Sequence, residues 1–300
     1  MIKVITDSVA GIRSDEAKER DIEVVSLYVR HQGVEYVDAE MDVDDFYSRI
    51  DQMVDDIPTS SQPSQLVFEE AFERAAREND EVLGVFISSR MSGTYEGAIR
   101  AARSVKERNE SFKCTLIDST TNSFDEASCV LDAVDARDAG LDLAACARET
   151  VEGVMRSRFL FTPETLTFLK AGGRIGSAAA LVGNLIQLCP VLTVRDGEAS
   201  TFAKVRTRKK ALDKIVKTFK EDVEAHGLKR IVVHYIGDKA PAVTWAREVI
   251  EPLVGHAVQV LPVSPVIGTH VGPAVGIAYE CKERIEGKFA GNPDDLVFSV

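Results

Sequence analysis

The chain has 300 residues, of which 45% are hydrophobic and 28% charged, and its formal net charge is −12. A chain of this length and composition can bury one large or two medium cores, so we expect two lobes. The acidic balance argues against a surface that neutralises many nucleic-acid phosphates, because such binding needs clustered lysine and arginine side chains.

In the first half, short β-branched runs alternate with helical patterns, which is typical of a mostly parallel sheet flanked by helices. We expect strands at residues 2–6, 22–29, 82–88 and 114–118. We expect helices at residues 42–53, 65–79, 94–108 and 125–139. The turn His31-Gln32-Gly33 predicts a hairpin that leaves this sheet.

In the second half, a helix is expected from residue 142 to 156, then the apolar run 159–161, then a helix begun by Pro163. We place the lobe boundary near residue 158, which gives an N-terminal α/β lobe at 1–158 and a C-terminal α/β lobe with a mixed sheet at 159–300. The dipeptide Asp196-Gly197 predicts a hairpin between two strands. The expected strands are 190–195, 199–205, 230–235 and 258–263, and the expected helices are 209–226 and 242–253.

The cysteines and the N-terminus indicate where the protein works. Five cysteines are scattered without a CxxC pair, which fits neither a disulfide framework nor a zinc site and favours a reducing compartment. The N-terminal residues lack the pattern of a signal peptide, and no apolar run approaches the roughly 20 residues that span a bilayer. We therefore expect a cytoplasmic protein without a transmembrane segment.

Two polar segments of the first half lie where strands end and helices begin. Residues 88–94 bring hydroxyls and free backbone amides to one helix N-terminus, which is either an anion site or a helix capped by Ser92. Residues 59–64 carry more hydrogen-bonding groups than one cap uses, so they form either a rigid polar loop or a capped turn. Ligands of open α/β sheets settle at such strand ends.

Two glycine-rich segments of the second half carry single basic residues. In residues 170–176 the glycines place Arg174 at the end of a short helix, where it either meets a carboxylate or phosphate or remains solvated. His270 lies between glycines in a loop expected after the strand at 258–263, and it can donate to an anion. By contrast, His234 lies in an apolar strand and is expected to be a satisfied core residue.

The motifs of common enzymes are missing from the sequence. It contains no Walker loop, GxGxxG, HExxH or GxSxG motif. An alternative function remains open on the residues alone: a phosphoryl-transfer enzyme in which serine-rich helix N-termini bind a phosphorylated small molecule while Asp7 and Asp118 hold a metal ion.

Five segments, taken together and in order, resemble a known family. They are Thr6-Asp7-Ser8, Ser61-Gln62-Pro63-Ser64, Ser88-Ser89-Arg90-Met91-Ser92-Gly93-Thr94-Tyr95, Gly172-Gly173-Arg174-Ile175 and Gly268-Thr269-His270-Val271-Gly272-Pro273. Over essentially its whole length the chain resembles the DegV family of fatty-acid-binding proteins. The resemblance implies two α/β lobes and a long-chain fatty acid buried in a tunnel near their interface, without a metal ion or cofactor.

The resemblance also implies a partner. The chain itself would not be a catalyst: it would present the fatty-acid carboxylate to a separate ATP-dependent fatty-acid kinase, and the acyl phosphate would enter phospholipid synthesis. The resemblance implies no nucleic-acid partner and at most a transient contact with a membrane.

By motif, the residues expected to hold the carboxylate are Ser60, where the family usually has threonine, together with Ser92 and His270. Arg174 matches the arginine linked to kinase engagement and phosphotransfer. The loops expected around the pocket contain Ser61, Gly93, Thr94, Gly268 and Thr269. Two departures from the family are expected to change the shape of the pocket: residues 120–126, where relatives have a glycine-rich helix start, and residues 272–276, which are one glycine short.

Overall fold

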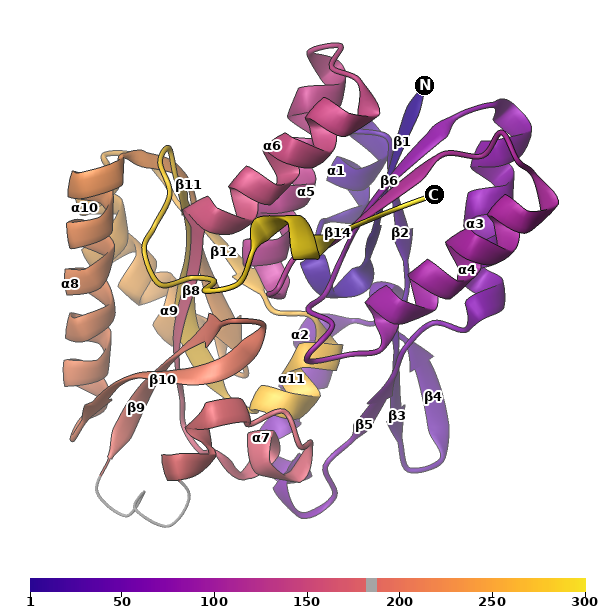
Figure 1. The fold of residues 1–300 in the computed structure, drawn as a ribbon. Coiled ribbons are helices and arrows are strands. Elements are labelled where there is room, and N and C mark those ends of the chain that lie inside the picture. The colour runs from indigo at the N-terminus through magenta and orange to yellow at the C-terminus, as the bar shows by residue number, and fades with distance from the viewer. Residues whose placement is uncertain (182–187) are drawn as a thin grey trace.

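The computed structural model describes residues 1–181 and 188–300. Within these ranges the strands form a five-stranded sheet, a six-stranded sheet and a small three-stranded sheet. Figure 1 shows the five-stranded sheet on the right and the six-stranded sheet on the left, with helices between them. The predicted α/β class, with a mostly parallel first sheet and a mixed second sheet, is confirmed.

The first sheet has the strand order β14-β7-β6-β1-β2. Its strands are β1 (Ile2–Asp7), β2 (Ile22–Val25), β6 (Glu81–Phe86), β7 (Cys114–Asp118) and β14 (Val297–Ser299). The four N-terminal strands are parallel, and β14 runs antiparallel to β7. These parallel strands are nearly continuous apolar runs because helices bury both of their faces.

One face of the first sheet packs on α3 (Gln65–Glu78) and α4 (Thr94–Arg108), around Phe68, Phe86 and Leu116. The other face packs on α1 (Ser14–Glu19), α5 (Ser123–Asp138) and α6 (Leu143–Arg156). Helix α5 contacts β1 and β6 of the first sheet and also β8 (Ser157–Pro163) and β13 (Ala274–Cys281) of the second. Helices α5 and α6 therefore form the layer between the two large sheets.

The second sheet has the order β10-β9-β8-β13-β11-β12. Its strands are β8 (Ser157–Pro163), β9 (Cys189–Arg195), β10 (Glu198–Val205), β11 (Leu228–Ile236), β12 (Gln259–Pro262) and β13 (Ala274–Cys281). Only β11 and β12 pair in parallel. Asp196 and Gly197 both have positive φ, at 49° and 80°, as a tight hairpin of right-handed twist requires, so the predicted β9-β10 hairpin is confirmed.

Helices cover the outer face of the second sheet: α8 (Arg208–His226), α9 (Lys239–Trp245), a π-helical turn (Ala246–Ile250) and α10 (Glu251–Val254). The last three follow one another without a gap and together cover the helix expected at 242–253, with a π-helical turn in its middle. Pro163, expected to begin a helix, is instead the last residue of β8, where a proline interrupts no further ladder bond. The following helix is the short α7 (Thr167–Ala171).

The small antiparallel sheet contains β3 (Tyr28–His31), β4 (Val34–Val37) and β5 (Thr59–Ser61) in the order β4-β3-β5. The strand expected at 22–29 is split, because after β2 the Leu27 amide donates to the Ser8 hydroxyl at 3.0 Å and the chain turns away from the first sheet. The helix expected at 42–53 is the short α2 (Val43–Tyr47), followed by a 3-10 turn at Ile50–Asp55.

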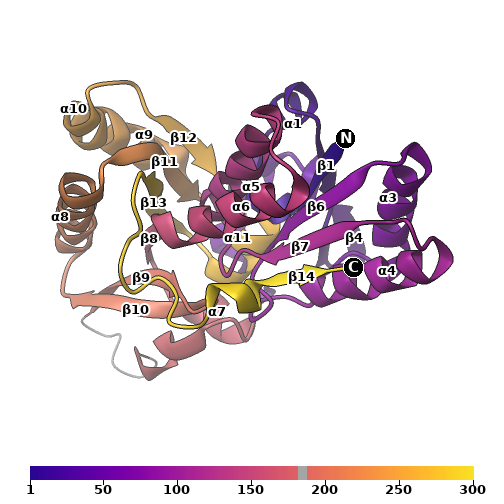
Figure 2. The same cartoon turned by 45° about the horizontal axis from the view of Figure 1, so that its top comes forward.

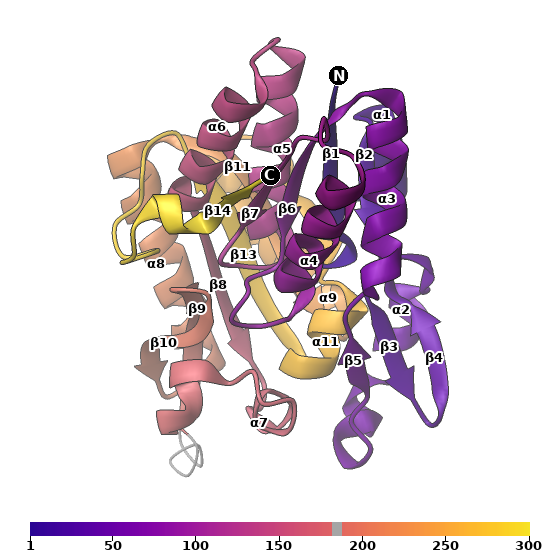
Figure 3. The ribbon, with the colours of Figure 1, turned by 45° about the vertical axis from the view of Figure 1, so that its right-hand side comes forward.

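Helix α11 (Pro265–Val271) carries His270, for which a loop was expected. Pro265 presets the backbone of the first turn. Asp38, from the first half of the chain, accepts hydrogen bonds from the Val266 amide at 2.9 Å and from the Ser264 hydroxyl. Figure 3 shows α11 beside β5, which it contacts. This long-range cap explains why the local sequence predicted no helix.

The end of the chain returns to the first sheet, as Figure 2 shows for β14 beside β7. Residues 297–299 were assigned to the C-terminal lobe, yet they pair with residues 115–117. The last strand of the predicted lobe 159–300 therefore belongs to the first sheet. The lobe boundary near residue 158 stays a prediction.

Candidate functional site

A cavity of about 290 Å³ lies between the two halves of the molecule. This volume is many times the ~10–15 Å³ needed to admit one water molecule and close to the lower end of small-molecule sites, roughly 300–1,000 Å³. The first half contributes Leu27, Ser60, Ser61, Gln62, Ile87, Met91, Ser92, Gly93 and Asn122 to its wall, and the second half contributes mainly apolar side chains of β8, β11, β13 and α11. Neither half forms this cavity alone.

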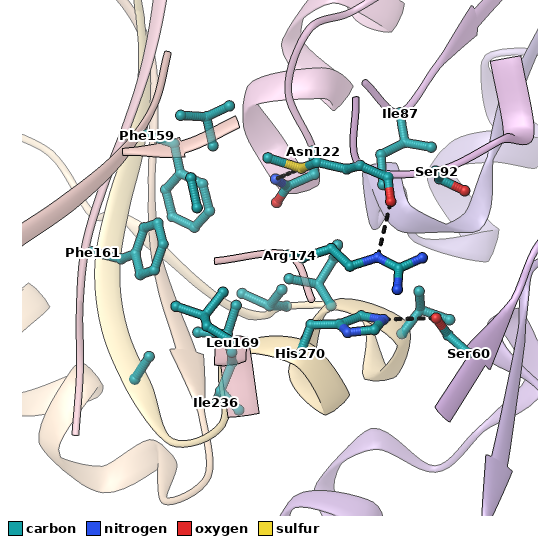
Figure 4. A pocket seen from close by; sticks show the side chains of 18 of the residues that line it. Ser60, Ile87, Ser92, Asn122, Phe159, Phe161, Leu169, Arg174, Ile236 and His270 are labelled. Carbon is teal, nitrogen blue, oxygen red and sulfur yellow. Dashed lines mark hydrogen bonds between the residues drawn. The ribbon is translucent and has the colours of Figure 1, made fainter. Parts of the chain in front are cut away.

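The wall of the cavity is mostly apolar away from one polar end. Phe159 and Phe161 lie on β8 with their ring centroids 5.0 Å apart. Val194 on β9 and Ile236 on β11 extend this apolar wall. Figure 4 shows the two phenylalanines on one side of the cavity and the polar side chains Ser60, His270 and Arg174 on the other.

Ser60 and His270 form the centre of the polar end. The Ser60 hydroxyl and His270 Nε2 share a hydrogen bond of 2.7 Å, although 210 residues separate them in the chain. Ser60 is on β5 and His270 on α11, so the contact between these two elements brings the pair together. The structure thus joins two residues that the sequence predicted separately.

The His270 ring is neutral near pH 7. Burial, assisted by the positive charge of Arg174, lowers its pKa to about 4. Its Nδ1 is buried and has no hydrogen-bond partner among the described residues. A Cβ atom added to Gly172 would lie 2.2 Å from that Nδ1, so only glycine allows α7 to approach the ring this closely.

Ser92 and Arg174 reach the same end of the cavity from two different loops. The Ser92 hydroxyl lies 2.8 Å from that of Thr94, at the start of α4. The exposed Arg174 donates from Nε to the Met91 carbonyl at 3.2 Å and from Nη1 to the Gly172 carbonyl at 2.7 Å. Arg174 is therefore held against the loop that carries Ser92.

The five residues predicted in the pocket loops divide into two groups. Ser61 and Gly93 line the cavity. Thr94, Gly268 and Thr269 are outside its lining: the Thr94 hydroxyl contacts that of Ser92, Gly268 packs against the Tyr47 ring, and the Thr269 hydroxyl donates to the Val266 carbonyl at 2.8 Å. These three residues support the wall from behind.

Asp7 and Asp118, the predicted metal ligands of the alternative phosphoryl-transfer enzyme, accept hydrogen bonds from backbone amides. Asp7 accepts from the Ile87 and Val9 amides at 2.8 and 2.9 Å, and burial raises its pKa to about 7. Asp118 accepts from the Thr120 amide at 2.8 Å, and burial raises its pKa as well. Asp7 is the last residue of β1 and Asp118 is the last residue of β7. Because β6 lies between these two strands, the two aspartates are on the order of 10 Å apart.

Neither carboxylate lines the cavity. In residues 1–181 and 188–300, no group of three or more His, Cys, Asp or Glu side chains could hold a metal ion.

Comparison with known families assigns the chain. Residues 1–282 match the family described as "Uncharacterised protein, DegV family". The chain belongs to the DegV family. A DegV domain-containing protein of Clostridium perfringens is 38% identical over 279 residues, which cover 93% of this chain and 98% of the relative. One of Clostridium acetobutylicum is 36% identical, with 95% and 99% covered.

Solved DegV structures share the fold. A DegV family protein of Thermus thermophilus, described by its fatty acid binding, has a TM-score of 0.81 and 32% identity, with 93% of this chain and 99% of that chain covered. DegV of Bacillus subtilis, described as a fatty acid binding protein, has a TM-score of 0.83 and 28% identity, with 94% and 99% covered. Among the described residues of this DegV chain, no helix combines the length and apolar character needed to cross a membrane.

Several cavity residues of this DegV chain were missed at the level of sequence. Phe159 and Phe161 alternate on one face of β8, a period-two signal that was available. The His234 ring also lines the cavity, although it was expected to be only a satisfied core residue. Its Nδ1 donates to the Leu261 carbonyl at 3.0 Å and its Nε2 accepts from the Phe124 amide at 3.3 Å, which shows that it is satisfied. Gln62 belonged to the predicted polar segment 59–64 and Asn122 to residues 120–126, but neither residue was singled out as part of the site.

Proposed function

We propose that this chain binds a long-chain fatty acid, with its acyl chain in the cavity and its carboxylate on Ser60, Ser92 and His270. The observation that carries the proposal is an apolar cavity that ends in polar groups from both halves of the chain. The descriptions of the Thermus and Bacillus relatives as fatty-acid-binding support it.

Burial of the acyl chain provides most of the affinity. About fourteen methylenes at roughly 0.8 kcal/mol each give on the order of 11 kcal/mol before association and ordering costs are subtracted. The phenylalanines of β8 and the branched side chains of β9 and β11 offer the surface for this burial.

The polar end determines which way the fatty acid points. A buried carboxylate without hydrogen bonds costs several kcal/mol, and the two serine hydroxyls and the neutral imidazole remove that cost. These groups leave one carboxylate oxygen free, whereas a bidentate arginine clamp would occupy both oxygens. Ser61 and Gly93 close the wall near the head group, and Thr94, Gly268 and Thr269 hold the elements that carry it.

An exposed head group suits transfer to another protein. We infer that the chain presents the carboxylate to a separate ATP-dependent fatty-acid kinase in the cytoplasm, and that Arg174 at the polar end engages the kinase and assists phosphotransfer. In this proposal the kinase, and not this chain, supplies the catalysis. We retain the boundary near residue 158 as the division between the two lobes that enclose the acyl chain.

The test begins with the lipid that the protein carries. Native mass spectrometry of purified protein, followed by organic extraction, is expected to identify a long-chain fatty acid. Ala199, which is buried on β10 and lines the cavity, is replaced in the variant Ala199→Phe to fill that space. The control Ala144→Phe changes an exposed residue of α6 that lies outside the cavity. Ala199→Phe should lose fatty-acid binding and Ala144→Phe should keep it; equal binding by both would contradict the assigned cavity.

The partner role needs a second assay with ATP and a purified fatty-acid kinase. Ser92→Ala and His270→Ala are expected to weaken fatty-acid binding and acyl-phosphate formation together. Arg174→Ala should keep binding and lose acyl-phosphate formation. Full binding and turnover in both Ser92→Ala and His270→Ala would show that the carboxylate is held elsewhere.

A further inference from the structure

Asn122 occupies the N-cap of α5 but does not cap the helix. An asparagine at this position normally accepts a hydrogen bond from an amide of the first turn, and here the side chain makes no such bond. The Phe124 amide is instead satisfied by His234 Nε2, at 3.3 Å, from the second sheet. A residue of the opposite half thus caps the helix, and the Asn122 amide is released from that role.

The released amide lies in the wall of the cavity with incomplete hydrogen bonding. Asn122 is 5% exposed and lines the cavity. Its Oδ1 accepts from the Ser123 hydroxyl at 2.8 Å, which fixes the orientation of the group. Within residues 1–181 and 188–300 its Nδ2 has one partner, the Met91 thioether sulfur at 3.4 Å, and a thioether is a weak acceptor. One N–H and one lone pair of Oδ1 therefore remain for a ligand.

Met91 relates Asn122 to the polar end of the cavity. The Met91 carbonyl accepts from Arg174, and the sulfur of the same residue contacts Asn122. A group that meets Asn122 would accordingly belong to the part of the acyl chain near the carboxylate.

We propose that Asn122 forms a second polar subsite, which binds a hydroxyl group on the carboxyl-proximal part of the acyl chain, so that the ligands include hydroxy fatty acids. This inference rests on the proposed function. A hydroxyl both donates and accepts, so it can accept a hydrogen bond from the free N–H of Nδ2 and donate one to Oδ1. A plain methylene would leave the second N–H of Nδ2 and the second lone pair of Oδ1 without a partner, which is unfavourable.

Equilibrium binding of three acids to the wild-type protein tests the subsite: palmitic acid, β-hydroxypalmitic acid and ω-hydroxypalmitic acid. We expect β-hydroxypalmitic acid to bind at least as tightly as palmitic acid. The ω-hydroxyl would be buried far from Asn122 without a partner, and its acid should bind about tenfold more weakly, the effect of one unsatisfied buried hydroxyl.

Two variants assign the effect to the amide. Asn122→Leu keeps a side chain of similar size and removes both polar atoms, so it should lower the affinity for β-hydroxypalmitic acid about tenfold relative to the affinity for palmitic acid. The control Asn109→Leu makes the same change at an asparagine outside the cavity and should keep the binding of both acids.

The outcomes separate this inference from the proposed function. If palmitic acid binds to wild type and β-hydroxypalmitic acid binds more weakly than palmitic acid, the subsite is wrong and the proposed function stands. If no fatty acid binds, both are wrong. Unchanged binding of β-hydroxypalmitic acid by Asn122→Leu would also overturn the subsite. Should that variant fail to fold, the comparison of acids on wild type decides alone.

Discussion

Two adjacent glycines at the end of α7 allow the role of His270 to be tested without changing His270 itself. Gly172 has a helical backbone, with φ −73° and ψ −12°, so alanine suits its conformation. The new methyl carbon, however, would lie 2.2 Å from His270 Nδ1 and 3.1 Å from Cε1. Non-bonded heavy atoms prefer about 3.5 Å or more, so the ring must retreat by about 1 Å.

The ring cannot retreat from Gly172 without disturbing its hydrogen bond to Ser60. Gly172 faces Nδ1, while Ser60 holds Nε2 at 2.7 Å on the other side. In Gly172→Ala the imidazole must therefore leave its rotamer and lose the bond to Ser60. A charge-assisted hydrogen bond to the carboxylate is worth about 1.5–3 kcal/mol, so we expect fatty-acid affinity to fall by about tenfold or more.

Gly173→Ala is the matched control. Gly173 has φ +70°, and a Cβ added there meets nothing within 4 Å. Alanine in this left-handed conformation costs roughly 1–2 kcal/mol of stability but leaves the imidazole untouched. Urea unfolding and fatty-acid titration of both variants should give opposite patterns: weaker binding in Gly172→Ala and lower stability in Gly173→Ala. Wild-type affinity in Gly172→Ala would refute the placement of His270 at the head group.

Three further predictions concern buried groups that join the two halves. Burial lowers the pKa of His234 to about 4, so below pH 6.5 this residue binds a proton in the unfolded chain but not in the folded chain. Between pH 7 and pH 5 the unfolding free energy of wild type should therefore fall by about 2 kcal/mol more than that of His234→Gln. Parallel pH profiles of the two proteins would contradict this prediction. Lys288, 4% exposed, pairs with buried Asp125, so Lys288→Met should lose about 3–5 kcal/mol in urea unfolding, and Asp125→Asn in that background should recover part of it. Asp38→Ala removes the hydrogen-bond acceptor at the start of α11, so it should lower the unfolding free energy by about 0.5–2 kcal/mol and weaken fatty-acid binding. Asp38→Asn should retain most of the stability and most of the binding. Full binding by Asp38→Ala would show that α11 needs no such cap.

The sequence alone determined the elements whose causes are local. The apolar runs of β1, β6 and β7 predict buried parallel strands because every residue of such a run needs cover from helices. Asp196-Gly197 predicts a tight hairpin because both positions must accept positive φ. Polar strand ends indicated the segments 59–64 and 88–94, and glycine-rich segments indicated Arg174 and His270. The resemblance to the DegV family then singled out Ser60 and Ser92 within the polar segments.

The tertiary structure decided how those candidates combine. Ser60 and His270 share a hydrogen bond only because α11 packs on the small sheet, and α11 is a helix because Asp38 satisfies its first amide from 228 residues away. Asn122 faces the cavity because His234, from another sheet, takes over its capping role. A local pattern cannot encode such contacts, because a hydrogen bond between distant segments depends on which surfaces the whole chain buries against each other.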